Sequence, residues 1–277
     1  LGDLDVPALT QADVDALGTW VAMREQLGVD AASGFLRVVG ATLARLADAE
    51  SAMIRTGQPE LWLSHTDDEL TTARAWRATA MFIPRIGALI DAVHRHHLVS
   101  AGDYFESVLP RPSTSMVCGV GFTDLSGFTA LTQTLSPPEL SMLLNGFAAT
   151  STDVIQSDSG RAVKLIGDSV MWVNATAGQL ARTAVDLVDH PKARAAGLQV
   201  RAGIAYGELL AINGDYFGNP VNLAARLVAA AAPGQILAAP EVHDQLPDWP
   251  MTAGHPLTLK GFDAPITPYE VSRLDTP

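Results

Sequence analysis

Two aspartates occupy positions from which a carboxylate can do chemistry. Asp124 follows an apolar run, MVCGVGFT, and precedes the turn residues Ser126 and Gly127. Asp168 lies in a Gly-Asp turn that joins two apolar stretches, 161–166 and 169–174, in the pattern of a β-hairpin. In a βαββαβ sheet the end of the first strand neighbours the turn of the central hairpin, so we expect the two carboxylates to converge.

Converging carboxylates repel each other unless a cation lies between them. With no His or Cys nearby, such oxygen ligands suit Mg²⁺ or Mn²⁺, which complete their shells with substrate phosphates and water. The pair therefore predicts phosphoryl chemistry on a nucleotide. The alternative is that each aspartate is an ordinary turn or capping residue.

The elements that would position this pair alternate along the second half of the chain. Ser136, followed by two prolines and Glu139, is typical of a capped helix start. The βαββαβ order predicts an α+β domain of ferredoxin-like type, with a mainly antiparallel sheet and helices on one face. The expected elements are a strand at 116–123, a helix from 137 to about 157, strands at 161–166 and 169–174, a helix at 177–189, strands near 198–206 and 208–213, and a helix at 220–231.

The first hundred residues predict an all-α domain, because apolar residues recur there at helical spacing. We expect helices at 10–28, at 31–54 and from about 66 onward, the last kinked or broken at Pro84. The predicted division is a helical domain at 1–108, a proline-containing linker at 109–115 and an α+β domain at 116–277; the family resemblance described below implies a regulatory role for the first and a catalytic role for the last.

Three histidines, His94, His96 and His97, cluster at the expected end of the last helix. Protonated histidines are favoured at a helix C-terminus and titrate near neutral pH, so a pH-sensing role is one hypothesis. An ordinary solvated helix end is the other. A weak helix-turn-helix pattern lies between residues 10 and 45.

Composition argues against several classes of function. The formal net charge is −12, which disfavours nucleic-acid binding through bulk charge. The single cysteine, Cys118, lies in an apolar strand and excludes an intramolecular disulfide, so we interpret it as a core thiol. No stretch reaches the roughly 18 apolar residues of a membrane span, and we expect a cytoplasmic protein.

Several stretches together resemble one family, the class III nucleotidyl cyclases. The matching stretches are FTDLSGFT at 122–129, KLIGDSVMW at 164–172, DYFGNPVNLAARL at 215–227 and LKGF at 259–262. The helical half resembles the autoinhibitory regulatory domains of soluble actinobacterial adenylyl cyclases. The resemblance implies a palm-type fold, a homodimer with active sites at its interface, and conversion of ATP to 3′,5′-cyclic AMP and pyrophosphate.

The resemblance also implies a role for each matching residue. Asp124 and Asp168 match the ligands of two Mg²⁺ or Mn²⁺ ions per active site, with the backbone carbonyl of Leu125 as a further ligand. Lys164 and Asp215 match the pair that selects adenine, which is chemically consistent because adenine offers an N1 acceptor and an amine donor.

Four more residues match positions around the sugar and the phosphates. Asn222 and Arg226 match residues that orient the ribose and stabilise charge on the α-phosphate, and their spacing places them on one helix face. Arg201 and Lys260 match residues that contact the terminal phosphates. Independently of the family, the chain has only three lysines, and two of them are Lys164 and Lys260.

Two other readings stay open. A non-catalytic nucleotide-binding or dimerisation module would share the fold, although no matching position has been lost. A diguanylate cyclase would also share the fold type, but Ile166-Gly167-Asp168 stands where a Gly-Gly-acidic hairpin would be expected. The short segment 207–214 leaves little room for the longer dimer arm that family members often carry.

Overall fold

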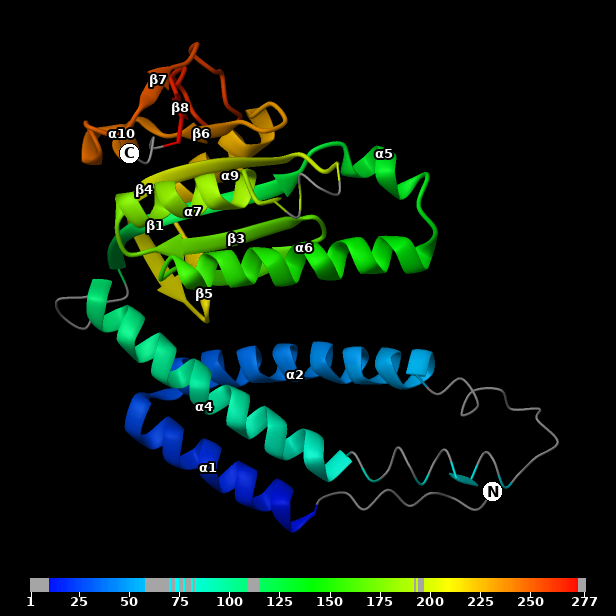
Figure 1. The fold of residues 1–277 in the computed structure, drawn as a ribbon. Coiled ribbons are helices and arrows are strands. Elements are labelled where there is room, and N and C mark those ends of the chain that lie inside the picture. The colour runs from blue at the N-terminus through cyan, green and yellow to red at the C-terminus, as the bar shows by residue number, and fades with distance from the viewer. Residues whose placement is uncertain are drawn as a thin grey trace. The chain divides into compact units, whose positions relative to one another are not determined.

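The computed structural model describes residues 10–57, 70, 73–74, 77, 81, 83–108, 115–191, 193 and 197–273. The chain divides into two compact units, Leu1–Val99 and Ser100–Pro277, each of which is described by itself. Figure 1 shows helices in the first part of the chain and a sheet with its helices in the second.

The helical part contains three described helices. Thr10 caps the first, because its hydroxyl accepts a hydrogen bond from the Asp13 backbone N–H at 3.3 Å and the Asp13 carboxylate accepts from the Thr10 N–H at 2.7 Å. The predicted start at Thr10 is therefore confirmed, whereas the predicted helix start near residue 66 lies outside the described residues. The helices are α1 (Gln11–Leu27), α2 (Val29–Gly57) and α4 (Ile83–Val108).

Helix α4 corrects the expected position of the histidines. Pro84 lies in its first turn, where proline is tolerated, and the helix continues to Val108. His94, His96 and His97 are therefore exposed residues within the helix, and the prediction that they stand at its C-terminus is wrong. The helix continues because its last part has a packing partner. Tyr104, only 8% exposed, belongs to the same hydrophobic cluster as Cys118 and Tyr216.

The second unit is built on a mainly antiparallel sheet with the order β2-β3-β1-β4-β6-β8-β7, and β5 pairs with β4 (Figure 1). Strand β1 lies between β3 and β4 and pairs antiparallel with both. The described strands are β1 (Ser115–Leu125), β2 (Arg161–Ile166), β3 (Ser169–Asn174), β4 (Val200–Ile212), β5 (Asp215–Phe217), β6 (Ile236–Ala238), β7 (Met251–Ala253) and β8 (Tyr269–Val271).

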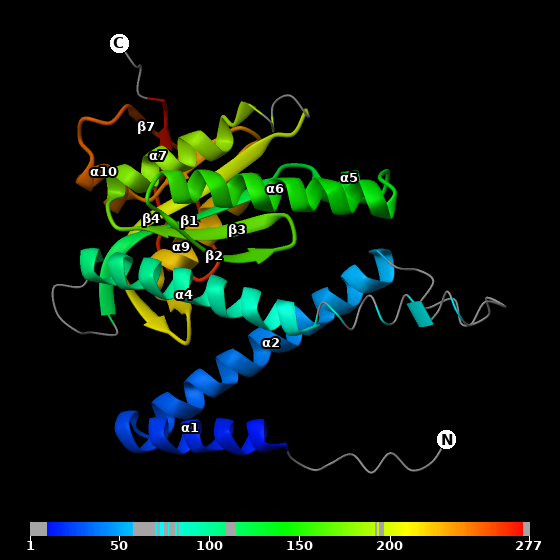
Figure 2. The same ribbon diagram turned by 60° about the horizontal axis from the view of Figure 1, so that its bottom comes forward.

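Helices cover both faces of this sheet, so the expectation of helices on one face is wrong. Helices α6 (Pro137–Ser157) and α7 (Ala177–Val188) pack against one hydrophobic cluster. Helix α9 (Asn219–Ala230) packs against the other cluster, on the opposite side (Figure 2). The alternation of side chains along β1 explains the two layers, because Cys118 and Val120 face α9 while a side chain at Gly119 would strike Leu180 of α7.

Strand β4 is also longer than expected. A break near residue 207 was predicted, but Gly207 stays in register opposite Cys118 and the strand continues to Ile212. The chain then reverses at Asn213 and Gly214, which have φ values of 55° and 76° and form a tight turn into β5. Segment 207–214 is thus the end of a strand and a hairpin turn. Two short helices, α5 (Phe128–Thr132) and α10 (Pro240–Gln245), complete the unit.

Two predictions from composition can be compared with this structure. Cys118 is fully buried in β1, and burial raises the pKa of its thiol to about 11, which confirms a core thiol. In the described parts of the chain, none of the helices has the length and apolar character that crossing a bilayer requires.

Candidate active site

Asp124 and Asp168 meet at one edge of the sheet, as their places in the sequence predicted. Asp124 is the last residue but one of β1 and pairs in register with Ser169, the residue after Asp168. The Leu125 backbone N–H donates a hydrogen bond to the Asp168 carbonyl at 3.3 Å, which fixes the hairpin turn beside the end of β1. Strand pairing therefore creates this pair of carboxylates.

The electrostatics of the pair suit a bound cation. Burial raises the pKa of Asp168 to about 6, and the hydrogen-bonded, negatively charged Asp124 adds to the rise, while Arg201 opposes it. In the described residues no cluster of three or more His, Cys, Asp or Glu side chains forms a metal site. The two carboxylates fit a hard divalent ion that takes its remaining oxygens from the backbone, water and a nucleotide.

Arg201 binds one of these carboxylates directly. It lies opposite Asp124 on β4, and its Nε and Nη2 groups donate to Asp124 Oδ2 at 3.1 and 2.7 Å. Both side chains are mostly buried, with 26% and 18% exposure. The predicted contact of Arg201 with terminal phosphates stays a prediction, whereas its bond with Asp124 was missed. A signal existed, because an Asp and an Arg near the ends of strands predicted to pair are natural cross-strand partners.

Lys164 and Asp215 form a second group, although they are far apart in the sequence. The Lys164 Nζ on β2 donates to Asp215 Oδ2 on β5 at 2.6 Å, with each side chain about one-third exposed. The other carboxylate oxygen accepts the Tyr216 backbone N–H at 2.8 Å. The pair therefore presents a fixed ammonium donor and a fixed carboxylate acceptor at the surface of the sheet.

Helix α9 carries the third group. Asn222 and Arg226 are exposed, while Leu223, Ala224 and Leu227 are buried on the other side of the helix. The predicted shared face is thus found, and it points away from the core. Lys260 is also exposed, in a turn between Leu257 and Ile266, which pair through two backbone hydrogen bonds.

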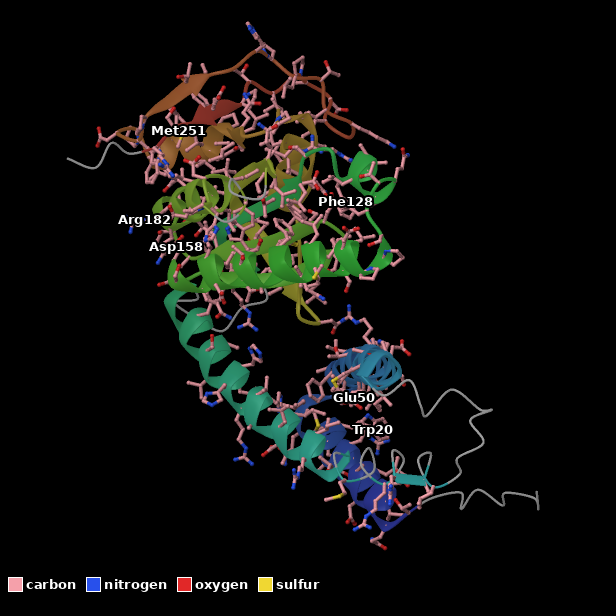
Figure 3. The ribbon with its side chains drawn as sticks, turned by 45° about the vertical axis from the view of Figure 1, so that its right-hand side comes forward. Trp20, Glu50, Phe128, Asp158, Arg182 and Met251 are labelled. Carbon is pink, nitrogen blue, oxygen red and sulfur yellow. The ribbon has the colours of Figure 1, made fainter. Side chains whose placement is uncertain are left out.

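Side-chain bonds do not connect all of these groups. Among the described residues, no side-chain hydrogen bond or ion pair joins Lys164 or Asp215 to Asp124 or Asp168. Figure 3 shows Phe128, four residues after Asp124, on one side of the unit and Asp158 and Arg182 on the other. In the described residues, the two carboxylates and the Lys164–Asp215 pair are thus two sets of side chains without a direct side-chain bond between them.

Residues 111–271 match the family described as the adenylate and guanylate cyclase catalytic domain. The chain belongs to this family. A match of this extent covers more than half of the chain and all of the groups described above. The predicted family and the predicted fold class are thereby confirmed, and the chain is an enzyme of the cyclase class.

Relatives and solved structures agree with this assignment. An uncharacterised protein of Mycobacterium tuberculosis is 66% identical over 267 residues, which cover 96% of this chain and 71% of that protein. An adenylate cyclase of Streptomyces coelicolor is 33% identical, covering 83% of this chain and 60% of the relative. A pH-sensitive adenylate cyclase of M. tuberculosis is 30% identical, covering 86% and 62%.

Among solved structures, the adenylyl cyclase CyaB from P. aeruginosa superposes with a TM-score of 0.52 at 28% identity. The superposition covers 59% of this chain and 98% of that one. An adenylate/guanylate cyclase/hydrolase from Silicibacter pomeroyi gives a TM-score of 0.52 at 25% identity, covering 57% and 98%. The similarity therefore comprises the sheet-containing unit.

Proposed function

We propose that the protein is an adenylate cyclase that converts ATP to 3′,5′-cyclic AMP and pyrophosphate. The observation that carries this choice of substrate is the ion pair of Lys164 with Asp215, at 2.6 Å. An ammonium has three N–H groups and a carboxylate several lone pairs, so both can contact a base while staying paired. Adenine matches them with an N1 acceptor and an amine donor, whereas guanine presents the reverse.

The reacting end of ATP would lie over the two aspartates. Two Mg²⁺ or Mn²⁺ ions would be held by Asp124, Asp168 and the Leu125 carbonyl. Such ions would lower the pKa of the 3′-hydroxyl and neutralise charge on the leaving pyrophosphate. Arg226 would donate to the α-phosphate as negative charge develops there, and Asn222 would orient the ribose. Lys260 and Arg201 would bind the terminal phosphates.

The active site would be shared between two copies of the chain. Within one chain, the carboxylate pair lacks a side-chain link to the base-recognition pair. Exposed apolar side chains lie near Lys164 and Asp215 in the same strands, with Ile166 on β2 at 55% exposure and Phe217 on β5 at 50%. Exposed apolar clusters of this kind favour a protein interface. A homodimer would cover them and bring one copy's aspartates to the other copy's Lys164 and Asp215.

The activity is tested by incubating the chain with ATP and Mg²⁺ or Mn²⁺ and measuring cyclic AMP. We expect activity in the wild type and a loss of about 10³-fold or more in Asp124→Ala, since a metal ligand and its charge are removed. The matched control is Asp153→Ala, an exposed aspartate on α6, which should keep wild-type activity. A wild-type protein that binds ATP without forming cyclic AMP would instead be a non-catalytic nucleotide-binding module.

Regulation by the helical part is a further piece of this proposal. His94, His96 and His97 are exposed on α4, and the end of the same helix packs through Tyr104 into the core beneath Tyr216, next to Asp215. A change in the helical part, by protonation or by an apolar ligand, would thus reach the base-recognition pair. Replacing the three histidines by Gln in the full chain should alter the pH profile of activity. Superimposable pH profiles of the variant and the wild type would exclude regulation by protonation of these histidines.

A further inference from the structure

Arg201 uses four hydrogen bonds to join two parts of the catalytic unit. Two of them go to Asp124 Oδ2, from Nε and Nη2. The other two run from Nη1 to the Ala229 and Ala231 carbonyls, at 3.3 and 3.2 Å. A guanidinium has five N–H groups in a rigid fork, so these bonds occupy most of its donors and fix its position.

The two carbonyls lie at the end of α9. Ala230 is the last residue of the helix and Ala231 its C-cap, and the last turn of the helix contains no basic residue. A helix C-terminus leaves carbonyl groups unpaired and favours a nearby cation. Arg201 supplies both the donors and the charge from the neighbouring strand.

We propose that Arg201 is a positioning residue that links metal binding at Asp124 to the end of α9. This inference rests on the proposed function, in which Asp124 is a metal ligand. A divalent cation on Asp124 competes with Arg201 for the same carboxylate and repels the guanidinium. The shift of the guanidinium weakens its bonds to Ala229 and Ala231, because one rigid group makes all four contacts.

The link has a consequence for the dimer. In the shared-site arrangement, each chain contributes to two active sites. Asp124 belongs to one of them, whereas Asn222 and Arg226, on helix α9 of the same chain, belong to the other. Metal binding in one site therefore changes the helix that completes the other site. Arg201 is also freed from Asp124 to contact a phosphate, so its predicted phosphate role follows metal binding.

Hydrogen exchange of the chain of residues 1–277 tests the link without any turnover. Deuterium uptake over residues 226–233 is compared with and without Mn²⁺, in the absence of nucleotide, at a Mn²⁺ concentration that calorimetry shows to be saturating. We expect Mn²⁺ to speed exchange of the last-turn amides by about two- to tenfold, the factor expected for weakening of one hydrogen bond at the helix end. The Ala231 N–H, which donates to the Leu227 carbonyl at 2.9 Å, is among these amides.

Two variants and a control isolate Arg201. Arg201→Gln and Arg201→Lys cannot span Asp124 and both carbonyls, so exchange over 226–233 should be fast without metal and unchanged by Mn²⁺. Arg182→Gln is the matched control, because Arg182 is exposed on α7 beside Asp158, on the side of the unit opposite Phe128 (Figure 3). It should keep the wild-type response.

The outcomes separate this inference from the proposed function. If Mn²⁺ binds the wild type and exchange over 226–233 does not change, the link through Arg201 is wrong, although cyclic AMP formation can still be found. A wild-type response that persists in Arg201→Gln also overturns the link. If calorimetry detects no Mn²⁺ binding that depends on Asp124, the metal site itself is wrong, and the inference fails with it.

Discussion

In the proposed function, base recognition depends on two side chains whose hydrogen-bonding groups are set by residue type. Lys164 offers only donors and Asp215 only acceptors, and the 2.6 Å bond between them fixes both heads at one place. A change of either type alters which hydrogen bonds a purine can make. Substrate choice is therefore a property of single residues.

Lys164→Glu combined with Asp215→Asn should reverse the preference for purines. The new carboxylate accepts from the guanine N–H groups and the new amide donates to the guanine carbonyl, while two charge-assisted bonds to adenine are lost. At about 1.5 kcal/mol each, kcat/KM for ATP should fall by about 10²-fold or more, and the GTP-to-ATP ratio should rise. Both rates are measured on one preparation, which controls for folding. An unchanged ratio would contradict adenine recognition by this pair.

Asp168→Asn should stabilise the protein when metal is absent. The pKa of Asp168 is raised from 3.8 to about 6 in the folded chain, so between these values the folded state binds more protons than the unfolded state and stability falls as pH rises. The variant stays neutral and avoids this loss. In EDTA at about pH 8 its Tm should exceed that of the wild type by about 1–3 °C, a range reduced for solvent screening.

The stability difference should close below about pH 3, where Asp168 is protonated in both states. Asp153→Asn, at an exposed site on α6, serves as the control and should show no such pH dependence. A variant that is less stable than the wild type at pH 8 would contradict a pKa of Asp168 raised by burial and by Asp124 in the folded chain.

At the scale of elements, the close packing of α9 on β4 positions Asn222 and Arg226. A Cβ at Gly203 would lie 2.2 Å from the Val228 backbone nitrogen and 2.4 Å from the Ala224 carbonyl oxygen. These are backbone atoms of the helix and cannot rotate away. The absence of a side chain at this position therefore sets the distance between helix and sheet.

Gly203→Ala should lower the free energy of unfolding by about 1–3 kcal/mol, because α9 must move away from the sheet. Activity should fall with it, since the helix carries Asn222 and Arg226. Gly146→Ala is the matched control, because Gly146 is exposed in the middle of α6 with no atom within 4 Å of an added Cβ. It should stabilise by about 0.5–1 kcal/mol. Urea unfolding measures both, and equal destabilisation by the two changes would contradict this packing.

Most of the elements were predictable because their signals are local. The hairpin at 161–174 and the capped helix from 137 to 157 match the structure residue for residue. The misses depend on tertiary contacts. Strand β4 continues through Gly207 because this residue pairs with Cys118 on β1. Helix α4 extends beyond its histidines because Tyr104 packs into the hydrophobic core. Helix α9 packs on the second face because Gly203, which has no side chain, allows it to approach the sheet closely.

In the candidate site, too, some contacts were predictable from the sequence and others depend on tertiary structure. Convergence of Asp124 with Asp168 followed from topology, and the pairing of Lys164 with Asp215 agreed with the resemblance to the family. The contact of Arg201 with Asp124 and the end of α9 was not predicted, because it requires the strand register and the position of a helix end together. The cross-strand pairing of Arg201 with Asp124 could have been expected from two strands predicted to pair, but the bonds to the end of α9 leave no pattern in sequence spacing.

At the scale of the whole molecule, the proposed active site requires two chains. Each chain carries the carboxylate pair and the base-recognition pair on separate groups of side chains, and apolar residues near Lys164 and Asp215 are exposed. In a homodimer with two shared sites, one chain contributes the carboxylates of a site and the other chain contributes its base-recognition pair. Substitutions in these two pairs therefore affect contributions from different chains. Complementation between inactive variants follows directly.

Mixing Lys164→Ala with Asp168→Ala is the measurement that tests this claim most directly. Each variant alone should form almost no cyclic AMP, while a 1:1 mixture should regain about a quarter of wild-type activity, because half of randomly assorted dimers are hybrids with one intact site of two. Lys164→Ala mixed with Asp215→Ala is the control and should stay inactive, because both lesions lie in the same half. If tagged hybrid dimers form and the first mixture remains inactive, the shared-site account is wrong.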